Sequence, residues 1–284
     1  KNIKIYSHVP VLKVICHLVI IVTTTSCDTI KENFDSGYFG LSQNKERLPG
    51  KRISILAQQR SIKPDITSDK HQIILPPPIT NKDWPQTGGY ANHAMHHLRL
   101  GQTLQKRWSV NIGTGSSSSE RLMAQPIIAQ GRLFTMDAET TINAYNINNG
   151  EELWSTQITP KGEEDDHING GLAFNNGKIY ATTGFGHIVA LAAKTGKISW
   201  RRDVKTPFRT APTAKDNRIF AITITNKLFA LNGQNGTILW THTGIEETTN
   251  LLGGGSPAID NSVVVAPYSS GELVALKVQN GQEL

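Results

Sequence analysis

The chain has 284 residues, of which 38% are hydrophobic and 18% charged, and its formal net charge is +6. The first 27 residues hold three of the 29 basic residues and none of the 23 acidic ones, so the remainder has 26 basic against 23 acidic residues and stands near +3. This net positive charge is too small to indicate a nucleic-acid-binding protein. Such a protein needs a stripe of basic residues, whereas the Lys and Arg residues here are scattered along the chain.

A short apolar stretch near the start predicts a targeting segment. Three lysines precede or interrupt Val14–Val22, which is too short to cross a bilayer core that needs about 20 residues. The next residues, Thr23–Cys27, resemble a bacterial lipoprotein cleavage box. We therefore predict a lipoprotein signal peptide over residues 1–27, lipidated on Cys27, with an ordinary cleaved leader or a free thiol as alternatives. With Cys27 acylated and Cys16 removed, no disulfide can form.

Residues 28–83 are predicted to be a flexible tether. They are mostly polar, with one apolar island at Leu48–Leu56 and a stiff proline run at Pro76–Pro78. Such a segment would hold a folded domain at some distance from a membrane-anchored Cys27.

The rest of the chain carries a repeat that decides the fold class. Its glycines are 46, 40 and 45 residues apart, a period that matches one four-stranded propeller blade. The sequence therefore predicts an all-β protein, a β-propeller of four-stranded antiparallel blades. The repeated segments are Gly150-Glu-Glu-Leu-Trp154, Gly196-Lys-Ile-Ser-Trp200, Gly236-Thr-Ile-Leu-Trp240 and Gly281-Gln-Glu-Leu284.

Each repeat shows the same order of strand and turn signals. An apolar run leads through a two-residue turn to a second strand, then to a third strand and the Gly-x-x-x-Trp segment. The third strands, such as Ile188–Leu191, are apolar on both faces, which indicates a sheet packed between two neighbours. The two-residue turns are of types that tolerate a positive φ: Gln130-Gly131, Asn176-Gly177, Asp216-Asn217 and Asp260-Asn261.

The repeat glycines and tryptophans are expected to have structural roles. Gly150, Gly196, Gly236 and Gly281 each follow Asn or Thr, which favours a tight turn with a residue at positive φ. The indoles of Trp154, Trp200 and Trp240 then fall on the outermost strands, where they can lie between adjacent blades. Burying one indole removes roughly 200 Å² from water, worth about 5 kcal/mol at most.

From Trp84 onward the chain resembles a known family. The motifs are Trp84–Gly89, His93, His96 and Trp108–Gly113, followed by the Gly-x-x-x-Trp repeats, with Leu48–Leu56 upstream. Together with the lipoprotein leader they resemble BamB, the lipoprotein of the outer-membrane β-barrel assembly (BAM) machinery. The repeats alone would indicate only the wider quinoprotein-like propeller superfamily.

The resemblance implies an eight-bladed, non-catalytic scaffold without a cofactor. It would bind the barrel-inserting protein BamA and other BAM subunits, and assist the folding and insertion of outer-membrane proteins. The location implied is the outer membrane, lipid-anchored and facing the periplasm. Asp28, directly after the lipidated cysteine, would favour inner-membrane retention by the enteric rule; we expect the outer membrane nevertheless.

Chain length limits the number of blades. Eight blades of about 43 residues would need roughly 350 residues, so we expect about four of eight over residues 84–284, with repeats ending near 156, 202, 242 and 284. Leu104–Ile112 has the sequence of an outer, closing-type strand with no inner strands before it. It would meet a blade that is not in this sequence, or close a four-bladed ring with residues 256–284.

Partner-binding residues follow from the resemblance alone. In the family a Leu-x-Leu-Arg-Gly loop is implicated in binding BamA, and the matching positions here are Leu251, Leu252 and Gly253. Leu252 stands in place of the arginine, so a small apolar docking point would remain. The alternative is that both leucines turn inward.

The enzyme alternative is a periplasmic quinone-dependent dehydrogenase, which would use adjacent cysteines and calcium-binding carboxylates. No adjacent cysteines occur, and the carboxylate run Glu163–Asp166 lacks the alternating spacing of a calcium loop. His93 and His97 would share a helix face, with His96 beside them, and could bind a metal, but no Cys or carboxylate ligand is nearby and we expect no metal site. Gly113–Ser119 could form an anion nest but has no Gly-Lys-Ser/Thr ending, and no Gly-x-Ser-x-Gly elbow is present. We expect no catalytic residues.

Overall fold

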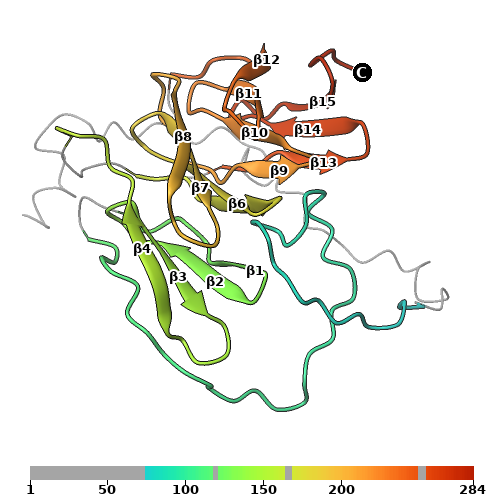
Figure 1. The fold of residues 1–284 in the computed structure, drawn as a ribbon. Helices are drawn as coiled ribbons and strands as arrows, with labels where there is room; N and C mark the ends of the chain where they lie inside the picture. Colours follow the sequence, from blue (N-terminus) through green and yellow to red (C-terminus); the bar gives the residue numbers. More distant parts are fainter. Residues whose placement is uncertain (1–73, 118–120, 164–167, 249–253) are drawn as a thin grey trace, which may run out of the picture. The chain divides into compact units, whose positions relative to one another are not determined.

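The computed structural model describes residues 74–117, 121–163, 168–248 and 254–284, which lie in one compact unit of the chain. These ranges fold into strands joined mostly by short turns, in chain order from green to red in Figure 1. The strands are β1 (Ile127–Ala129), β2 (Arg132–Met136), β3 (Thr141–Asn146), β4 (Glu152–Gln157), β5 (Leu172–Asn175), β6 (Lys178–Thr182), β7 (His187–Ala192), β8 (Ile198–Asp203), β9 (Thr213–Lys215), β10 (Arg218–Ile222), β11 (Lys227–Asn232), β12 (Ile238–Thr243), β13 (Ala258–Asp260), β14 (Val263–Pro267) and β15 (Leu273–Lys277).

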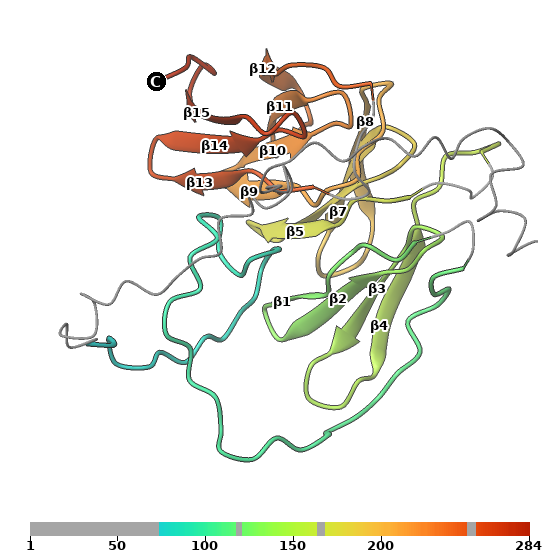
Figure 2. The ribbon, with the colours of Figure 1, turned by 180° about the vertical axis from the view of Figure 1, so that it is seen from behind.

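The strands form four antiparallel sheets, each a simple meander. The first sheet is β1-β2-β3-β4, the second β5-β6-β7-β8, the third β9-β10-β11-β12 and the fourth β13-β14-β15. Figure 2 shows the same sheets from behind. In the fourth sheet, the fourth-strand position holds only an isolated bridge between Leu276 and Glu283. The predicted all-β propeller blades are confirmed.

The described residues contain no helix long and apolar enough to cross a membrane.

Three of the four turns between first and second strands have the predicted backbone; in the fourth sheet the predicted Asp260-Asn261 turn is one residue too early, because Asp260 ends β13 paired with Val263 and Asn261, at φ 46°, begins the turn. Asn176 and Gly177 have φ values of 47° and 76°, and Asp216 and Asn217 have values of 48° and 62°. Two consecutive residues at positive φ give a turn whose twist matches that of a two-residue hairpin. The Asn, Asp and Gly residues at these positions therefore fix the register of these two hairpins.

The hydrophobic core lies between the sheets. The central four residues of β3, β7 and β11 are buried, because the second and third sheets each lie between two other sheets and the free face of the first sheet is covered by residues 108–112. Three clusters fill the gaps: one joins the first and second sheets around Phe134 and Leu191, one the second and third around Tyr180, and one the third and fourth around Phe220. First strands of successive sheets are also in contact.

Each tryptophan of the repeat ties its own outer strand to the next sheet. We call this arrangement the indole staple. The ring lies against the repeat glycine of the following sheet, and the indole N–H donates to a carbonyl just beyond that sheet's third strand. The pairs are Trp108 with Ile147 at 2.9 Å, and Trp154 with Ala193, Trp200 with Gly233 and Trp240 with Val278 at 3.0 Å each.

The segment Leu104–Ile112 forms no strand in the described part of the chain, unlike the expected closing-type strand. A strand needs a hydrogen-bonded neighbour, and the described residues supply none on either side of this segment. Trp108 nevertheless makes the indole staple to the first sheet, with its ring against Gly150. Leu104–Ile112 thus packs against the first sheet as an outer strand would, although it makes no strand-to-strand hydrogen bonds with the described residues.

The predicted tether lies mostly outside the described residues. Within its last part, Ile79 forms a parallel bridge with Leu98, and the Asp83 carboxylate accepts a hydrogen bond from the Gln130 amide at 3.0 Å. These residues therefore contact the rest of the compact unit.

Candidate functional site

Two kinds of loop emerge on one side of the sheets. In a meander of four strands, the turn from second to third strand and the connection to the next sheet leave from the same end. We call this side the connection face, and the side with the first–second and third–fourth turns the hairpin face.

The connection face has a cavity between the third and fourth sheets, which we call the connection pocket. Its volume is about 240 Å³, and its walls are mainly apolar. The walls come from two inter-sheet connections and from the second-to-third turns of both sheets. Lining residues include Arg209, Thr210, Ile222, Gly255, Pro267 and Tyr268.

The two sheets around the connection pocket are linked by Asn226, which is buried. The Asn226 Oδ1 atom accepts hydrogen bonds from the Ser269 amide and hydroxyl, both at 2.9 Å, and its Nδ2 donates to the Ile245 carbonyl at 2.6 Å. Asn226 has a φ of 56°, a conformation that Asn tolerates better than most residues. This side chain therefore fixes the relative position of the pocket walls.

Tyr268 provides a second link between the third and fourth sheets. Its hydroxyl lies 2.6 Å from the Nδ1 atom of His242, and the His242 Nε2 atom lies 2.8 Å from a Glu283 carboxylate oxygen. Burial, assisted by the negative charges of Glu272 and Glu283, raises the pKa of the Tyr268 phenol. The phenol is therefore neutral at physiological pH and can donate to the imidazole.

Two polar groups of the connection pocket have no partner among the described residues. The Thr210 hydroxyl oxygen is buried and makes no hydrogen bond there. Arg209, the one charged residue among those that line the pocket, makes no ion pair with any described residue. The Thr210 hydroxyl is too buried to reach a ligand, but a guanidinium with no ion partner among the described residues, beside apolar walls, suits a ligand with an apolar group next to a carboxylate.

The glycines of the pocket wall keep it open. A Cβ on Gly255 would lie 2.6 Å from the Pro267 ring, and one on Gly254 would lie 3.1 Å from the Thr210 methyl group. Neither glycine has a positive φ, so an alanine there would be limited by space in the pocket wall rather than by its own backbone.

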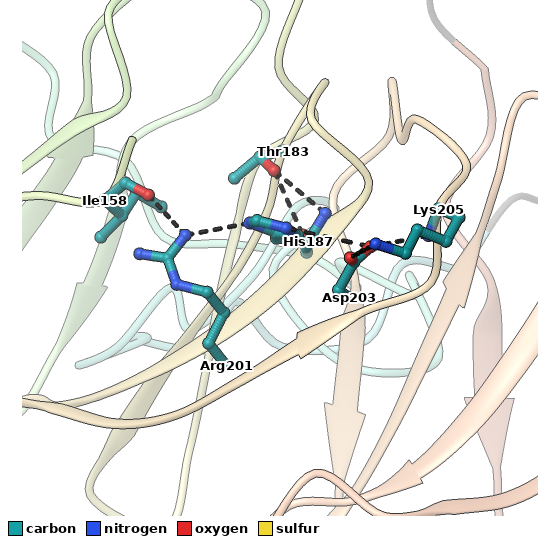
Figure 3. Close-up of polar contacts among 6 residues, drawn as sticks. All are labelled: Ile158, Thr183, His187, Arg201, Asp203 and Lys205. Carbon is teal, nitrogen blue, oxygen red and sulfur yellow. Dashed lines mark hydrogen bonds and ion pairs between the residues drawn. The ribbon is translucent and has the colours of Figure 1, made fainter. Parts of the chain in front are cut away.

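A second polar cluster lies on the connection face around the second sheet (Figure 3). One Arg201 Nη atom lies 2.7 Å from the Ile158 carbonyl oxygen and 3.0 Å from the His187 Nδ1 atom. Burial is the main cause that lowers the pKa of His187, and the positive charge of Arg201 lowers it further. The neutral ring accepts a hydrogen bond from Arg201 at Nδ1, so Arg201 bridges the first and second sheets.

The other side of the His187 ring faces Asp203. Its Nε2 atom lies 3.9 Å from an Asp203 carboxylate oxygen, and Lys205 lies 2.5 Å from the other oxygen. The hydrogen bond from Lys205 lowers the pKa of Asp203. With Glu163, these side chains line a polar cavity of about 290 Å³. Its mixed charges favour no single ligand.

The predicted docking residues Leu251, Leu252 and Gly253 lie outside the described residues, as does Cys27. Gly254, the next residue in the chain, lines the connection pocket. The repeat residues Gly150, Gly196, Gly236, Gly281, Trp154, Trp200 and Trp240 all belong to the indole staples.

The predicted helix face shared by His93 and His97 is wrong. His93 and His96 have φ values of 55° and 57°, which interrupt any helix, and the His93 ring packs on Gly88. The His97 Nδ1 atom lies 2.7 Å from the Pro76 carbonyl oxygen. Within the described ranges, no three His, Cys, Asp or Glu side chains are grouped so as to hold a metal ion.

Gly113–Ser119, a candidate anion nest that we expect to be a polar loop, is only partly described, and its first residues already have a partner. The Thr114 amide donates to the Asp137 carboxylate at 3.1 Å, and Gly113, at φ 110°, lies against the same carboxylate. An anion at this position would face that negative charge.

The connection pocket was not predicted from the sequence. Arg209, Thr210 and Tyr268 come from separate loops and share no local pattern. The nearest sequence signal was the glycine run after Leu252, which marks one wall.

Residues 138–284 match a family profile described as outer membrane protein assembly factor BamB. The match covers the second, third and fourth sheets and every wall of the connection pocket.

A curated relative, the outer membrane protein assembly factor BamB of Moranella endobia, is 24% identical over 184 residues, which is 63% of this chain and 47% of the relative. The crystal structure of BamB from Moraxella catarrhalis superposes with a TM-score of 0.50 at 19% identity, covering 60% of this chain and 50% of that one. The quinohemoprotein alcohol dehydrogenase ADHIIG of Pseudomonas putida superposes with a TM-score of 0.55 at 18% identity, and the superposition covers 71% of this chain and 39% of the dehydrogenase. This chain spans less than half the length of the curated relatives it matches.

Proposed function

Because this chain belongs to the outer membrane protein assembly factor BamB family, we propose that it is a non-catalytic scaffold of outer-membrane protein assembly. It would bind a BamA-like barrel protein and other subunits of the BAM complex, and assist the folding and insertion of outer-membrane proteins. The family match over 138–284 carries this proposal.

The connection pocket is the site that we propose for the partner. It is mainly apolar, it has one cationic residue on its wall, and its lining residue Gly254 directly follows Leu251–Gly253 in the sequence, the positions that match the family's partner-binding loop. A partner segment with an apolar side chain beside an Asp or Glu would fill the cavity and neutralise Arg209.

We further propose that Cys27 carries a lipid anchor in the outer membrane, facing the periplasm. The leader pattern of residues 1–27 supports this assignment. Replacing Cys27 by Ser should move the protein from the membrane fraction to the soluble periplasmic fraction. An unchanged membrane fraction would argue against the anchor.

Co-purification tests the scaffold role. Tagged protein, expressed in its own organism and extracted gently with detergent, should recover a BamA-like barrel protein, identified by mass spectrometry. Recovery of no barrel-assembly protein, with the tagged chain intact, would contradict the proposal.

A charge reversal tests the pocket separately. Arg209→Glu should weaken binding to the periplasmic domains of the barrel protein by about tenfold, because it replaces an attraction with a repulsion. Lys194→Glu makes the same charge change at an exposed position on the hairpin face and should leave affinity unchanged. If the two variants bind the barrel protein with equal affinity, the partner does not bind at the connection pocket.

A second candidate is a quinone-dependent dehydrogenase, favoured by the fold shared with the quinohemoprotein alcohol dehydrogenase. It predicts a bound quinone chromophore and dye-linked oxidation of alcohols or sugars. Absence of both after addition of the quinone and calcium would remove this candidate.

A further inference from the structure

One short segment, Trp84–Ala91, makes main-chain hydrogen bonds to the first strands of the first, second and fourth sheets and reaches the third sheet through a side chain. At the first sheet, Trp84 and Ile128 of β1 exchange two backbone hydrogen bonds, at 2.7 and 2.8 Å. At the second sheet, the Phe174 amide of β5 donates to the Pro85 carbonyl at 2.7 Å. The segment therefore pairs with the edges of β1 and β5 that are not covered by β2 and β6.

The third sheet is reached by a side chain instead of the backbone. The Gln86 Oε1 atom accepts a hydrogen bond from the Ala214 amide of β9 at 2.9 Å, and its Nε2 atom lies 3.5 Å from the Ala214 carbonyl oxygen. Gln86 is only 3% exposed. Its carboxamide thus takes the place of one peptide group of a neighbouring strand.

A tight turn then carries the segment to the fourth sheet. The Gly89 amide donates to the Gln86 carbonyl at 2.9 Å, and Gly88 and Gly89 have φ values of 77° and 85°, which favour glycine. Beyond the turn, the Ile259 amide of β13 donates to the Ala91 carbonyl at 2.6 Å.

These bonds satisfy backbone groups on the inner edges of the sheets. Each first strand pairs with its second strand on one side only, so its other edge needs a partner where it is buried. The neighbouring first strands are in contact but form no ladder with one another. Within the described residues, Trp84–Ala91 is the segment that bonds to all four inner edges.

We infer that Trp84–Ala91 is a strap that holds the inner strands of the four sheets together and sets the spacing of the third and fourth sheets. Gln86 holds β9 and Ala91 holds β13, and these strands begin the two sheets that form the connection pocket. The strap itself does not line that pocket. A change in the strap should therefore act on the pocket from a distance, through sheet spacing.

Hydrogen exchange of the full chain, followed residue by residue by NMR, tests the strap. Gln86→Met keeps the side-chain length and removes both bonds to Ala214, and Gln86→Ala removes the side chain as well. The same changes at the exposed Gln102 are the matched controls. The Ile259 amide is the decisive probe, because its own partner, the Ala91 carbonyl, is untouched by either substitution.

In both Gln86 variants the Ala214 and Ile259 amides should exchange about tenfold faster than in the Gln102 variants, since losing the strap lets the third and fourth sheets separate together. If both Gln86 variants fail to fold while both Gln102 variants fold, the result would also support the strap. Faster exchange at Ala214 alone, or at neither amide, would overturn the inference, because Gln86 would then be a local bond.

The effect on partner binding rests on the proposed function. If the wild-type chain binds a BamA-like barrel protein, Gln86→Met should weaken that binding although it does not touch the pocket. If the wild-type chain binds no such protein, the scaffold role fails while the exchange experiment still decides on the strap.

Discussion

Replacing Gly236 by Ala is the sharpest test of the indole staple. Gly236 has a φ of 70°, and a Cβ there would lie 2.5 Å from the Trp200 ring. Left-handed backbone costs an alanine about 1 kcal/mol more than a glycine. Moving the indole also loses its 3.0 Å hydrogen bond to Gly233, about 1 kcal/mol, and its contact with Tyr180, about 1 kcal/mol. We expect Gly236→Ala to lower the free energy of unfolding by about 3 kcal/mol in total.

The assay is equilibrium unfolding in urea, followed by tryptophan fluorescence. Gly131→Ala is the control, because Gly131 also has a positive φ, 72°, but a Cβ there would meet nothing within 4 Å. It should cost only the backbone strain, about 1 kcal/mol. Equal losses of unfolding free energy for the two variants would show that the indole contact contributes nothing beyond backbone strain.

Two further predictions concern the polar cluster of the second sheet. Arg201→Met should lower the free energy of unfolding by about 1 to 2 kcal/mol in the same assay, because the Ile158 carbonyl and the His187 ring lose their donor; Lys197→Met, at an exposed position, should change it little. Burial lowers the pKa values of His93 and His187 below the ordinary 6.5, so the unfolded chain binds more protons near that pH and stability should fall as pH falls through about 6.5. His187→Gln should flatten this dependence, and an unchanged slope would show that the His187 pKa is the same in both states.

The blades could be predicted from the sequence because their signals are local. Asn176-Gly177 and Asp216-Asn217 set two consecutive residues at positive φ, and β7 between them is apolar on both faces, so it must be buried on both. The position of Trp200 relative to Gly196 also follows from the repeat. That each indole lies on the next sheet's glycine, rather than on its own, needed the structure.

The strap and the connection pocket could not be predicted because their contacts join distant parts of the chain. Gln86 bonds to Ala214, 128 residues away, and nothing in the local sequence distinguishes it from an exposed glutamine. The predicted helix around His93 failed for a related reason. The pairing of Ala91 with β13 and the packing of the His93 ring on Gly88 override the helical spacing of the histidines.

Above all, we propose that this chain is a protein-binding scaffold of outer-membrane assembly. The most direct measurement is a titration of the purified chain with the periplasmic domains of a BamA-like barrel protein from the same organism, by calorimetry. We predict saturable binding by the wild-type chain, weakened about tenfold by Arg209→Glu and unaffected by Lys194→Glu. No binding by the folded wild-type chain, together with quinone-dependent oxidation of an alcohol or sugar, would contradict the claim.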